Sequence, residues 1–182
     1  MKRTDTVGTL TNADRIPRDR YILRVLTAVF GTSQSSGNPM ITVEFEVLSD
    51  KEGSDTVLVG DRRLNIAGKR IRQYYVTKVL TDESKTPEKM GRVFDLFERC
   101  GCPQDDIDEN NPDVKQLENK TVEAILYSKE TTKYKDPTPE QRAMGQRVGD
   151  PILDSNGNPV IVYDLAIDSI LGPSSVTAPG GY

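Results

Sequence analysis

The run Met40–Leu48, MITVEFEVL, constrains the fold more than any other stretch of this sequence. Apolar residues occupy every second position within it: Ile41, Val43, Phe45 and Val47. Polar or charged side chains stand between them. Successive side chains of a β-strand point to opposite faces of the sheet, so this alternation predicts a strand with one buried and one solvated face.

A second apolar run precedes this strand. Tyr21–Phe30, YILRVLTAVF, is rich in β-branched and aromatic residues, and it lies between Pro17 and the loop Gly31–Pro39. Such composition between turn-forming residues predicts another strand. Two strands joined by a Gly/Ser-rich connection most often form a hairpin, and we expect one here.

Three further strands are predicted downstream. The basic stretch Arg62–Lys78 alternates on both sides of Gly68, which indicates a third strand interrupted by a bulge or turn. Thr121–Thr131 and Val160–Ile170 alternate in the same way and predict the fourth and fifth strands.

One helix is predicted between the third and fourth strands. Thr86 can cap it, and Pro87 suits the first helical position. Its apolar residues recur at helical spacing and form a single stripe, which ends before Gly101 and Pro103. Core packing is the expected role of this stripe.

This order of elements predicts a mainly β fold. A helix between the third and fourth of five strands is the connectivity of the oligonucleotide/oligosaccharide-binding (OB) barrel. We therefore expect a five-stranded OB-fold-like barrel with a helix between strands 3 and 4 and with long loops. The expected parts are a flexible N-terminal arm at 1–19, an OB-like nucleic-acid-binding domain at 20–172 and a flexible C-terminal tail at 173–182.

Two clusters combine cations with aromatic rings. The first is Arg62–Lys78, which contains no acidic residue and carries the pair Tyr74 and Tyr75. The second is Lys133–Lys135, with Tyr134 at its centre. In an OB fold the ligand crosses strands two and three between the loops joining strands one to two and four to five, and both clusters fall in these places. Cations that follow phosphates and rings that stack on bases suit single-stranded nucleic acid.

The candidate residues follow from these clusters and from the fourth strand. The cations expected to contact phosphate are Arg62, Arg63, Lys69, Arg70, Arg72, Lys78, Lys129, Lys133 and Lys135. The candidates for stacking are Tyr74, Tyr75, Tyr127 and Tyr134. Alternation places Tyr74 and Tyr75 on opposite faces, so at most one of the two is expected to touch a base. Glu44 and Glu46 face outward on strand two and count against binding of phosphate there.

Composition narrows the classes of function. The chain has 182 residues, a formal net charge of −4 and no histidine. It therefore lacks the commonest general base and neutral metal ligand, and neither an enzyme nor a cofactor or metal site is expected. With two cysteines, no membrane-length apolar run and no apolar leader at Met1, we expect a cytoplasmic protein that does not contact membranes.

The sequence resembles small bacteriophage single-stranded-DNA-binding proteins over roughly residues 20–173. The resemblance is one of pattern and order. It is carried by the strand–loop–strand Tyr21–Leu48 with SGNPM and ITVEFEV, by the helix MGRVFDLFERCG, by LENKTVEAILYSKE in strand four, and by the final strand ending ILGPS.

The resemblance implies protection and organisation of single strands during phage DNA replication and recombination, without catalysis, and for a phage-encoded chain the expected location is the host cytoplasm. Single-stranded DNA would be the main partner, replication or recombination proteins are candidate partners, and a homo-oligomer is left open. Proteins of this family commonly recruit partners through an acidic tail. Gly172–Tyr182 carries no acidic residue, so recruitment through the tail is in doubt here.

Two alternative functions remain at this point. A small β domain with a polar arm and a Pro/Gly tail also suits a virion structural or accessory protein that mediates protein–protein contacts. The carboxylates of Asp105–Glu109 could hold a divalent cation in a nuclease. A solvated acidic loop is the simpler explanation of that cluster.

Overall fold

The computed structural model describes residues 9–10 and 15–175. Of the predicted N-terminal arm, residues 1–8 and 11–14 lie outside this range, as do residues 176–182 of the predicted tail. None of the helices in the described part combines the length and apolar character needed to span a bilayer.

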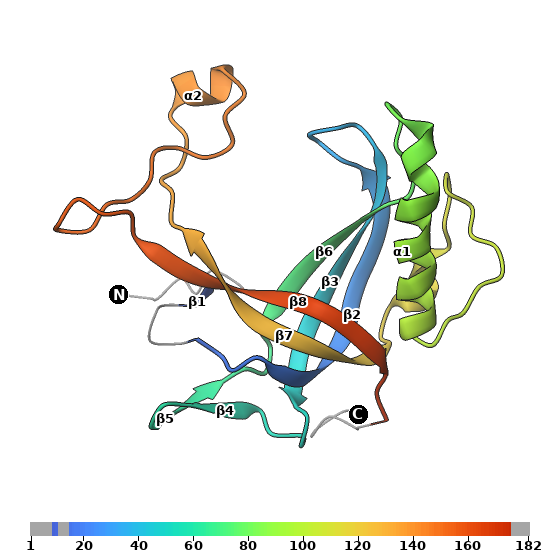
Figure 1. Cartoon of the computed structure of the whole chain (residues 1–182), viewed down its shortest axis with the longest axis horizontal. Coiled ribbons are helices and arrows are strands. Elements are labelled where there is room, and N and C mark those ends of the chain that lie inside the picture. The colour runs from blue at the N-terminus through green and yellow to red at the C-terminus, as the bar shows by residue number, and fades with distance from the viewer. Residues whose placement is uncertain (1–8, 11–14, 176–182) are drawn as a thin grey trace.

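One antiparallel sheet of six strands forms the body of the protein, in the order β1-β8-β7-β2-β3-β6 (Figure 1). Its strands are β1 (Thr9–Leu10), β2 (Asp19–Thr32), β3 (Pro39–Asp50), β6 (Arg70–Val76), β7 (Thr121–Thr132) and β8 (Ile161–Pro173). Because β1 has two residues, five long strands make up most of the sheet. The mainly β prediction is confirmed, and so is the β2–β3 hairpin.

The third predicted strand is corrected by the structure. Its first part, β5 (Arg62–Asn65), pairs with β4 (Thr56–Val59) in a separate two-stranded sheet. Gly68 has a φ of +82° in the turn that follows, and its backbone N–H donates to the Val47 carbonyl. Only the second part, β6, belongs to the main sheet.

The helices lie in the connections between strands. They are η2 (Glu83–Lys85), α1 (Thr86–Arg99), η3 (Val114–Leu117) and α2 (Pro139–Ala143). The predicted helix is α1, and it follows β6 and precedes β7 in the chain. Thr86 does not cap it, because the side chain Oγ1 instead accepts a hydrogen bond from the Val79 backbone N–H at 3.0 Å.

The core lies between the inner face of the sheet and α1. The four alternating apolar residues of β3 are at most 1 % exposed: Ile41, Val43, Phe45 and Val47. Val93, Leu96 and Phe97 on one side of α1 belong to the same buried cluster. The alternation in the sequence therefore identified the buried face of β3 correctly.

The sheet curves so that its β6 end approaches β8 (Figure 1). Gln73 Nε2 on β6 donates a hydrogen bond to the backbone carbonyl of Ile167 on β8 at 3.4 Å. In the described residues no backbone pairing joins these two strands, so backbone hydrogen bonds do not close the sheet into a barrel.

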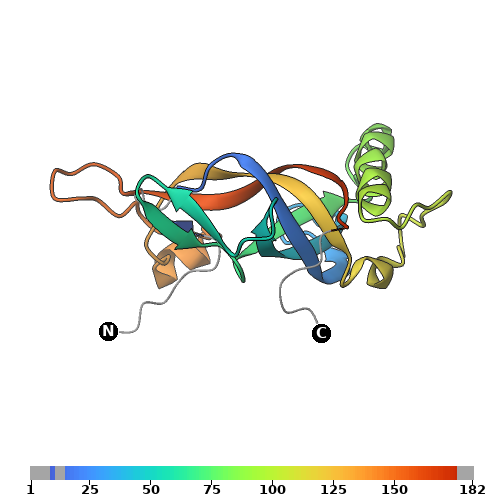
Figure 2. The ribbon, with the colours of Figure 1, turned by 90° about the horizontal axis from the view of Figure 1, so that it is seen from below.

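The β7–β8 connection, residues 133–160, extends away from the body of the sheet. Figures 1 and 2 place α1 at one end of the molecule and the far part of this connection at the other. The connection carries α2 and continues the β7–β8 pairing through the isolated bridge between Tyr134 and Pro151. We call residues 133–160 the β7–β8 arm.

Candidate nucleic-acid interface

The outer face of β3 and β6 changes from apolar to charged along its length. Residues of the two strands that face each other across the ladder are Met40 and Val76, Thr42 and Tyr74, Glu44 and Arg72, and Glu46 and Arg70. The apolar end of this face lies next to the β2–β3 loop, since Met40 is the second residue of β3 after that loop. Aromatic and cationic side chains thus lie side by side on a solvated surface.

A cavity of about 710 Å³ lies over the apolar end of this face, and we call it the Tyr74 pocket. Besides β3 and β6, it is lined by the end of β2, the serine-rich loop that follows β2, and the β7–β8 arm. Its lining comprises Thr32, Ser33, Gln34, Ser35, Ser36, Met40, Thr42, Arg72, Tyr74, Val76 and Arg147. Two of these residues are arginines, and none of the described lining residues is acidic, although the whole chain is acidic on balance.

Local hydrogen bonds fix the part of the β7–β8 arm that carries Arg147. The Lys135 backbone N–H donates to the Asp150 carbonyl at 2.9 Å, and the Gly149 N–H donates to the Lys135 carbonyl at 2.9 Å. A Cβ atom at Gly149 would lie 2.6 Å from the Asp136 carbonyl oxygen, so this close approach of the backbone requires glycine. These contacts fix the backbone two residues after Arg147.

Tyr74 and Tyr75 lie on opposite faces of β6, as their alternation predicts. Tyr74 is 59 % exposed and lines the Tyr74 pocket. Tyr75 is partly buried and packs against the core cluster. Burial raises the pKa of its hydroxyl above the ordinary value. Tyr75 is therefore a core residue and does not present its ring for stacking.

Arg70 and Arg72 share a single carboxylate partner. Glu44 lies 3.2 Å from Arg70 Nη1 through Oε1 and 2.9 Å from Arg72 Nη2 through Oε2. The hydrogen bond to Glu44, with a smaller contribution from Tyr74, raises the pKa of the Arg72 guanidinium. Glu46 pairs instead with Arg24 on β2 at 2.5 Å. The two outward glutamates of β3 are thus paired with arginines.

The other cations of the basic stretch lie elsewhere. Arg62 and Arg63 are on the β4–β5 hairpin, outside the main sheet. Lys69 lies in the turn before β6. Lys78 forms an ion pair with Glu109 at 3.0 Å, and this contact raises the pKa of its ammonium group. The structure therefore brings only Arg72 and Tyr74, among the residues predicted from this stretch, into the Tyr74 pocket.

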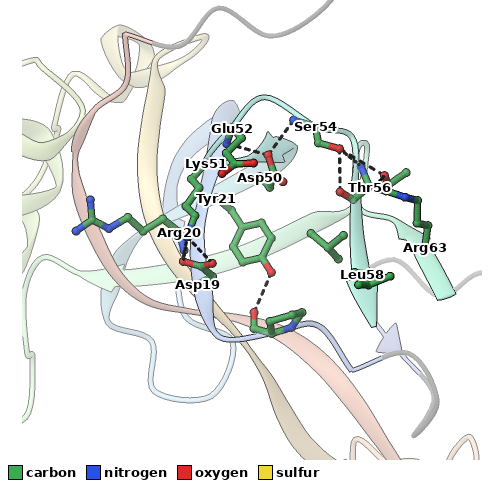
Figure 3. A pocket seen from close by; sticks show the side chains of 12 residues that line it. Asp19, Arg20, Tyr21, Asp50, Lys51, Glu52, Ser54, Thr56, Leu58 and Arg63 are labelled. Carbon is green, nitrogen blue, oxygen red and sulfur yellow. Dashed lines mark hydrogen bonds and ion pairs between the residues drawn. The ribbon is translucent and has the colours of Figure 1, made fainter. Parts of the chain in front are cut away.

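Arg63 lines a second cavity of about 420 Å³, which we call the Tyr21 pocket (Figure 3). Its charged side chains balance, with three acidic and three basic residues: Asp19, Asp50, Glu52, Arg20, Lys51 and Arg63. Many of its polar groups serve local structure. Asp50 accepts hydrogen bonds from the backbone N–H groups of Glu52 and Ser54, and Tyr21 donates its hydroxyl proton to the Pro17 carbonyl (Figure 3). This pocket has no excess positive charge to attract a nucleic acid.

The candidates on β7 and the arm form two groups. Tyr127 and Lys129 lie on the outer face of β7, and β2 and β3 separate β7 from β6 in the sheet. Lys133, Tyr134 and Lys135 are exposed at the base of the β7–β8 arm. This second group shares the arm with Arg147, whereas Tyr127 and Lys129 are not brought to the Tyr74 pocket.

The acidic loop after α1 shows no metal-site geometry. No group of three or more acidic, cysteine or histidine side chains that could hold a metal ion is found among residues 9–10 and 15–175. Glu109 pairs with Lys78, and the Asp108 carboxylate accepts a hydrogen bond from the Asn110 backbone N–H. These contacts give the loop a structural role at the end of β6.

Several lining residues of the Tyr74 pocket were not predicted from the sequence. Met40 and Arg147 are the most informative, because they add an apolar contact and a cation beside Tyr74. The serine-rich loop, including Gln34, adds hydrogen-bonding groups. For Arg147 and the serine-rich loop, the only sequence signal was their place in the loops that flank an OB-type site; for Met40, it was its place at the start of the predicted second strand.

Comparison with protein-family models finds no match to this chain, and comparison with curated protein sequences finds none either. The geometry of the Tyr74 pocket is therefore the basis for assigning a function.

Replacing Arg147 tests whether the arm takes part in binding. If the arginine contacts phosphate, Arg147→Ala should weaken binding of an oligo-dT strand roughly tenfold, the scale of a lost hydrogen bond to a charged group. The slope of log K against log salt should become shallower by about 0.7, the value for one phosphate contact to a single strand. Fluorescence titration at several salt concentrations measures both quantities.

Arg142→Ala is the matched control. Arg142 is exposed on the same arm but does not line the Tyr74 pocket. Equal losses from the two variants would mean that bulk charge, and not the pocket, accounts for the effect of Arg147.

Proposed function

We propose that the protein binds single-stranded DNA with little sequence preference, in the Tyr74 pocket and along the outer face of β3 and β6. The observation that carries the proposal is the lining of that pocket. It combines an exposed tyrosine ring, two arginines and an apolar floor, with no carboxylate among its described residues. An aromatic surface beside cations is the arrangement with which proteins hold unpaired bases and their phosphates.

The proposed fold is an OB barrel completed by side chains. The five long strands β2, β3, β6, β7 and β8 would be its strands one to five, with α1 between the third and fourth. The Gln73–Ile167 hydrogen bond would join its third and fifth strands. In this assignment the Tyr74 pocket lies on strands two and three, between the loops that join strands one to two and four to five. These are the places where OB folds bind their ligands.

The proposed biological role is protection and organisation of single strands during phage DNA replication and recombination. It rests on the resemblance to phage single-stranded-DNA-binding proteins together with the lining of the pocket. Replication or recombination proteins would be further partners, and no catalytic step is part of the proposal.

The test is fluorescence titration with a labelled oligo-dT strand, repeated with duplex DNA and single-stranded RNA as competitors. We expect binding whose log K falls with log salt with a slope of about −2, if Arg70, Arg72 and Arg147 each contact one phosphate. Duplex DNA should compete poorly, because its base faces are stacked and cannot reach Tyr74. Absence of binding in low-salt buffer would refute the proposal, and copurification with virion particles would then favour the structural alternative.

A further inference from the structure

Glu44 pairs with two arginines on the outer face of β6. Its carboxylate lies between the guanidinium groups of Arg70 and Arg72, one oxygen to each, at 3.2 and 2.9 Å. The Glu44 side chain is 18 % exposed, whereas those of Arg70 and Arg72 are 50 % and 58 % exposed. The carboxylate therefore lies deeper in the surface than the two cations that hold it.

The same guanidinium faces both Glu44 and the proposed ligand. Arg72 lines the Tyr74 pocket, and it also lines a smaller cavity together with Glu44, Arg70 and Tyr74. Arg72 stands two residues from Tyr74 on one face of β6, about 7 Å along the strand. A nucleotide whose base stacks on Tyr74 would direct a phosphate towards Arg72.

Carboxylate and phosphate compete for arginine because they use the same geometry. The guanidinium group presents N–H donors in a planar fork that matches two oxygens of either anion. A guanidinium that donates to Glu44 has fewer donors for a phosphate. Its net charge is also offset by the carboxylate beside it.

We propose that Glu44 is an internal competitor for the DNA phosphate, which sets the affinity of the site below what its arginines could provide. The inference rests on the proposed function and adds a regulation of the same site. When DNA binds, a phosphate replaces the Glu44 carboxylate at Arg70 and Arg72. The loss of the ion pairs with Glu44 offsets part of the attraction between these two arginines and the DNA. A protein that must be displaced from single strands benefits from an affinity for DNA that is limited in this way.

An opposite role for Glu44 predicts the opposite result. If the carboxylate serves to hold Arg70 and Arg72 in position for phosphate, its loss should leave them mobile and weaken binding. The sign of the change in affinity therefore separates competition from positioning.

The experiment compares oligo-dT binding by the wild-type protein and by Glu44→Gln, which keeps the shape and removes the charge. Competition predicts binding about tenfold tighter, within the range for release of two exposed ion pairs. It also predicts a salt slope steeper by about 0.7, because the site then carries one more net positive charge to neutralise phosphate. Unchanged or weaker binding by a variant with wild-type thermal stability would overturn the inference.

Glu46→Gln is the matched control. It removes the same charge from the same face of the same strand, but Glu46 pairs with Arg24 and not with the arginines beside the pocket. Its effect should stay within about twofold. A gain equal to that of Glu44→Gln would show that bulk charge is responsible and would overturn the inference.

A double variant identifies the partner of Glu44. In the Arg72→Ala background, Glu44→Gln should raise the affinity much less than it does in the wild-type background. One of the two guanidinium groups for which the carboxylate and the phosphate compete is then gone. An undiminished gain would contradict competition at Arg72.

Failure of the proposed function and failure of this inference give different results. If the wild-type protein does not bind oligo-dT at all, the proposed function itself is wrong. If it binds and Glu44→Gln does not tighten binding, only this inference fails.

Discussion

Tyr74→Ala should weaken binding of oligo-dT by about 10- to 100-fold and leave the melting temperature close to that of the wild-type protein. Stacking of one base on an aromatic side chain is worth about 1–3 kcal/mol, and Tyr74 is the only aromatic residue among the described residues that line the Tyr74 pocket. Its ring is 59 % exposed, so removing it takes little from the core. Fluorescence titration and thermal denaturation measure the two effects.

Two further variants test whether the loss of binding is due to the aromatic ring at position 74. Tyr74→Phe keeps the ring and should bind nearly as well as the wild-type protein. Tyr134→Ala removes the same kind of side chain from a position that is 45 % exposed and does not line the Tyr74 pocket, so its effect should be smaller. If Tyr74→Ala binds oligo-dT as well as the wild-type protein does, the assignment of the stacking residue is wrong.

Phe45→Ala should lower the free energy of unfolding by about 3–5 kcal/mol, the usual cost of removing a buried phenylalanine ring. Phe45 is 0 % exposed on the inner face of β3, between Val43 and Val47. The side chains on the other face of the same strand form the proposed binding surface. Urea denaturation measures the loss, and binding of the folded fraction should also weaken if β3 shifts.

Thr27→Ala is a control on the neighbouring strand β2. Thr27 is exposed, so the change should stay within about 1 kcal/mol, the range of strand propensities. A loss for Phe45→Ala as small as that for Thr27→Ala would mean that β3 does not form the centre of the core.

Hydrophobic alternation was enough to predict β3 and its buried face. It works because side chains of a strand alternate strictly between faces, so a period of two is visible in the sequence itself. In β3 the pattern identified all four core residues, and in β6 it separated exposed Tyr74 from partly buried Tyr75. These are local properties, which the sequence carries directly.

Pairing between strands is not local, and the prediction for the third strand was wrong. Arg62–Lys78 looked like one interrupted strand, but β5 pairs with β4, whereas β6 pairs with β3. A turn at Gly68 redirects the chain between them. Periodicity describes which face a side chain takes but contains no information about the partner strand, so Arg62 and Arg63 were grouped with Arg72 although they lie on a separate hairpin.

The Tyr74 pocket was predicted only in part for a related reason. Arg147 lies in a loop without periodicity, and it lines the same cavity as Tyr74 although the two residues are 73 positions apart in the sequence. The pairing of Glu44 with Arg70 and Arg72 likewise depends on the register of β3 against β6. Glu44 was predicted to face outward and to repel phosphate. Only the register of the two strands showed which cations it forms ion pairs with.

The most direct test of the central claim is photo-crosslinking of the wild-type protein to an oligo-dT strand that carries 5-iododeoxyuridine, followed by tryptic digestion and mass spectrometry. Tyr74 lies in the tryptic peptide Gln73–Lys78, QYYVTK, together with Tyr75, and fragmentation of that peptide separates the two. The proposed site predicts the principal adduct at Tyr74. A stable complex whose adducts are confined to Tyr127, on the outer face of β7, would contradict it.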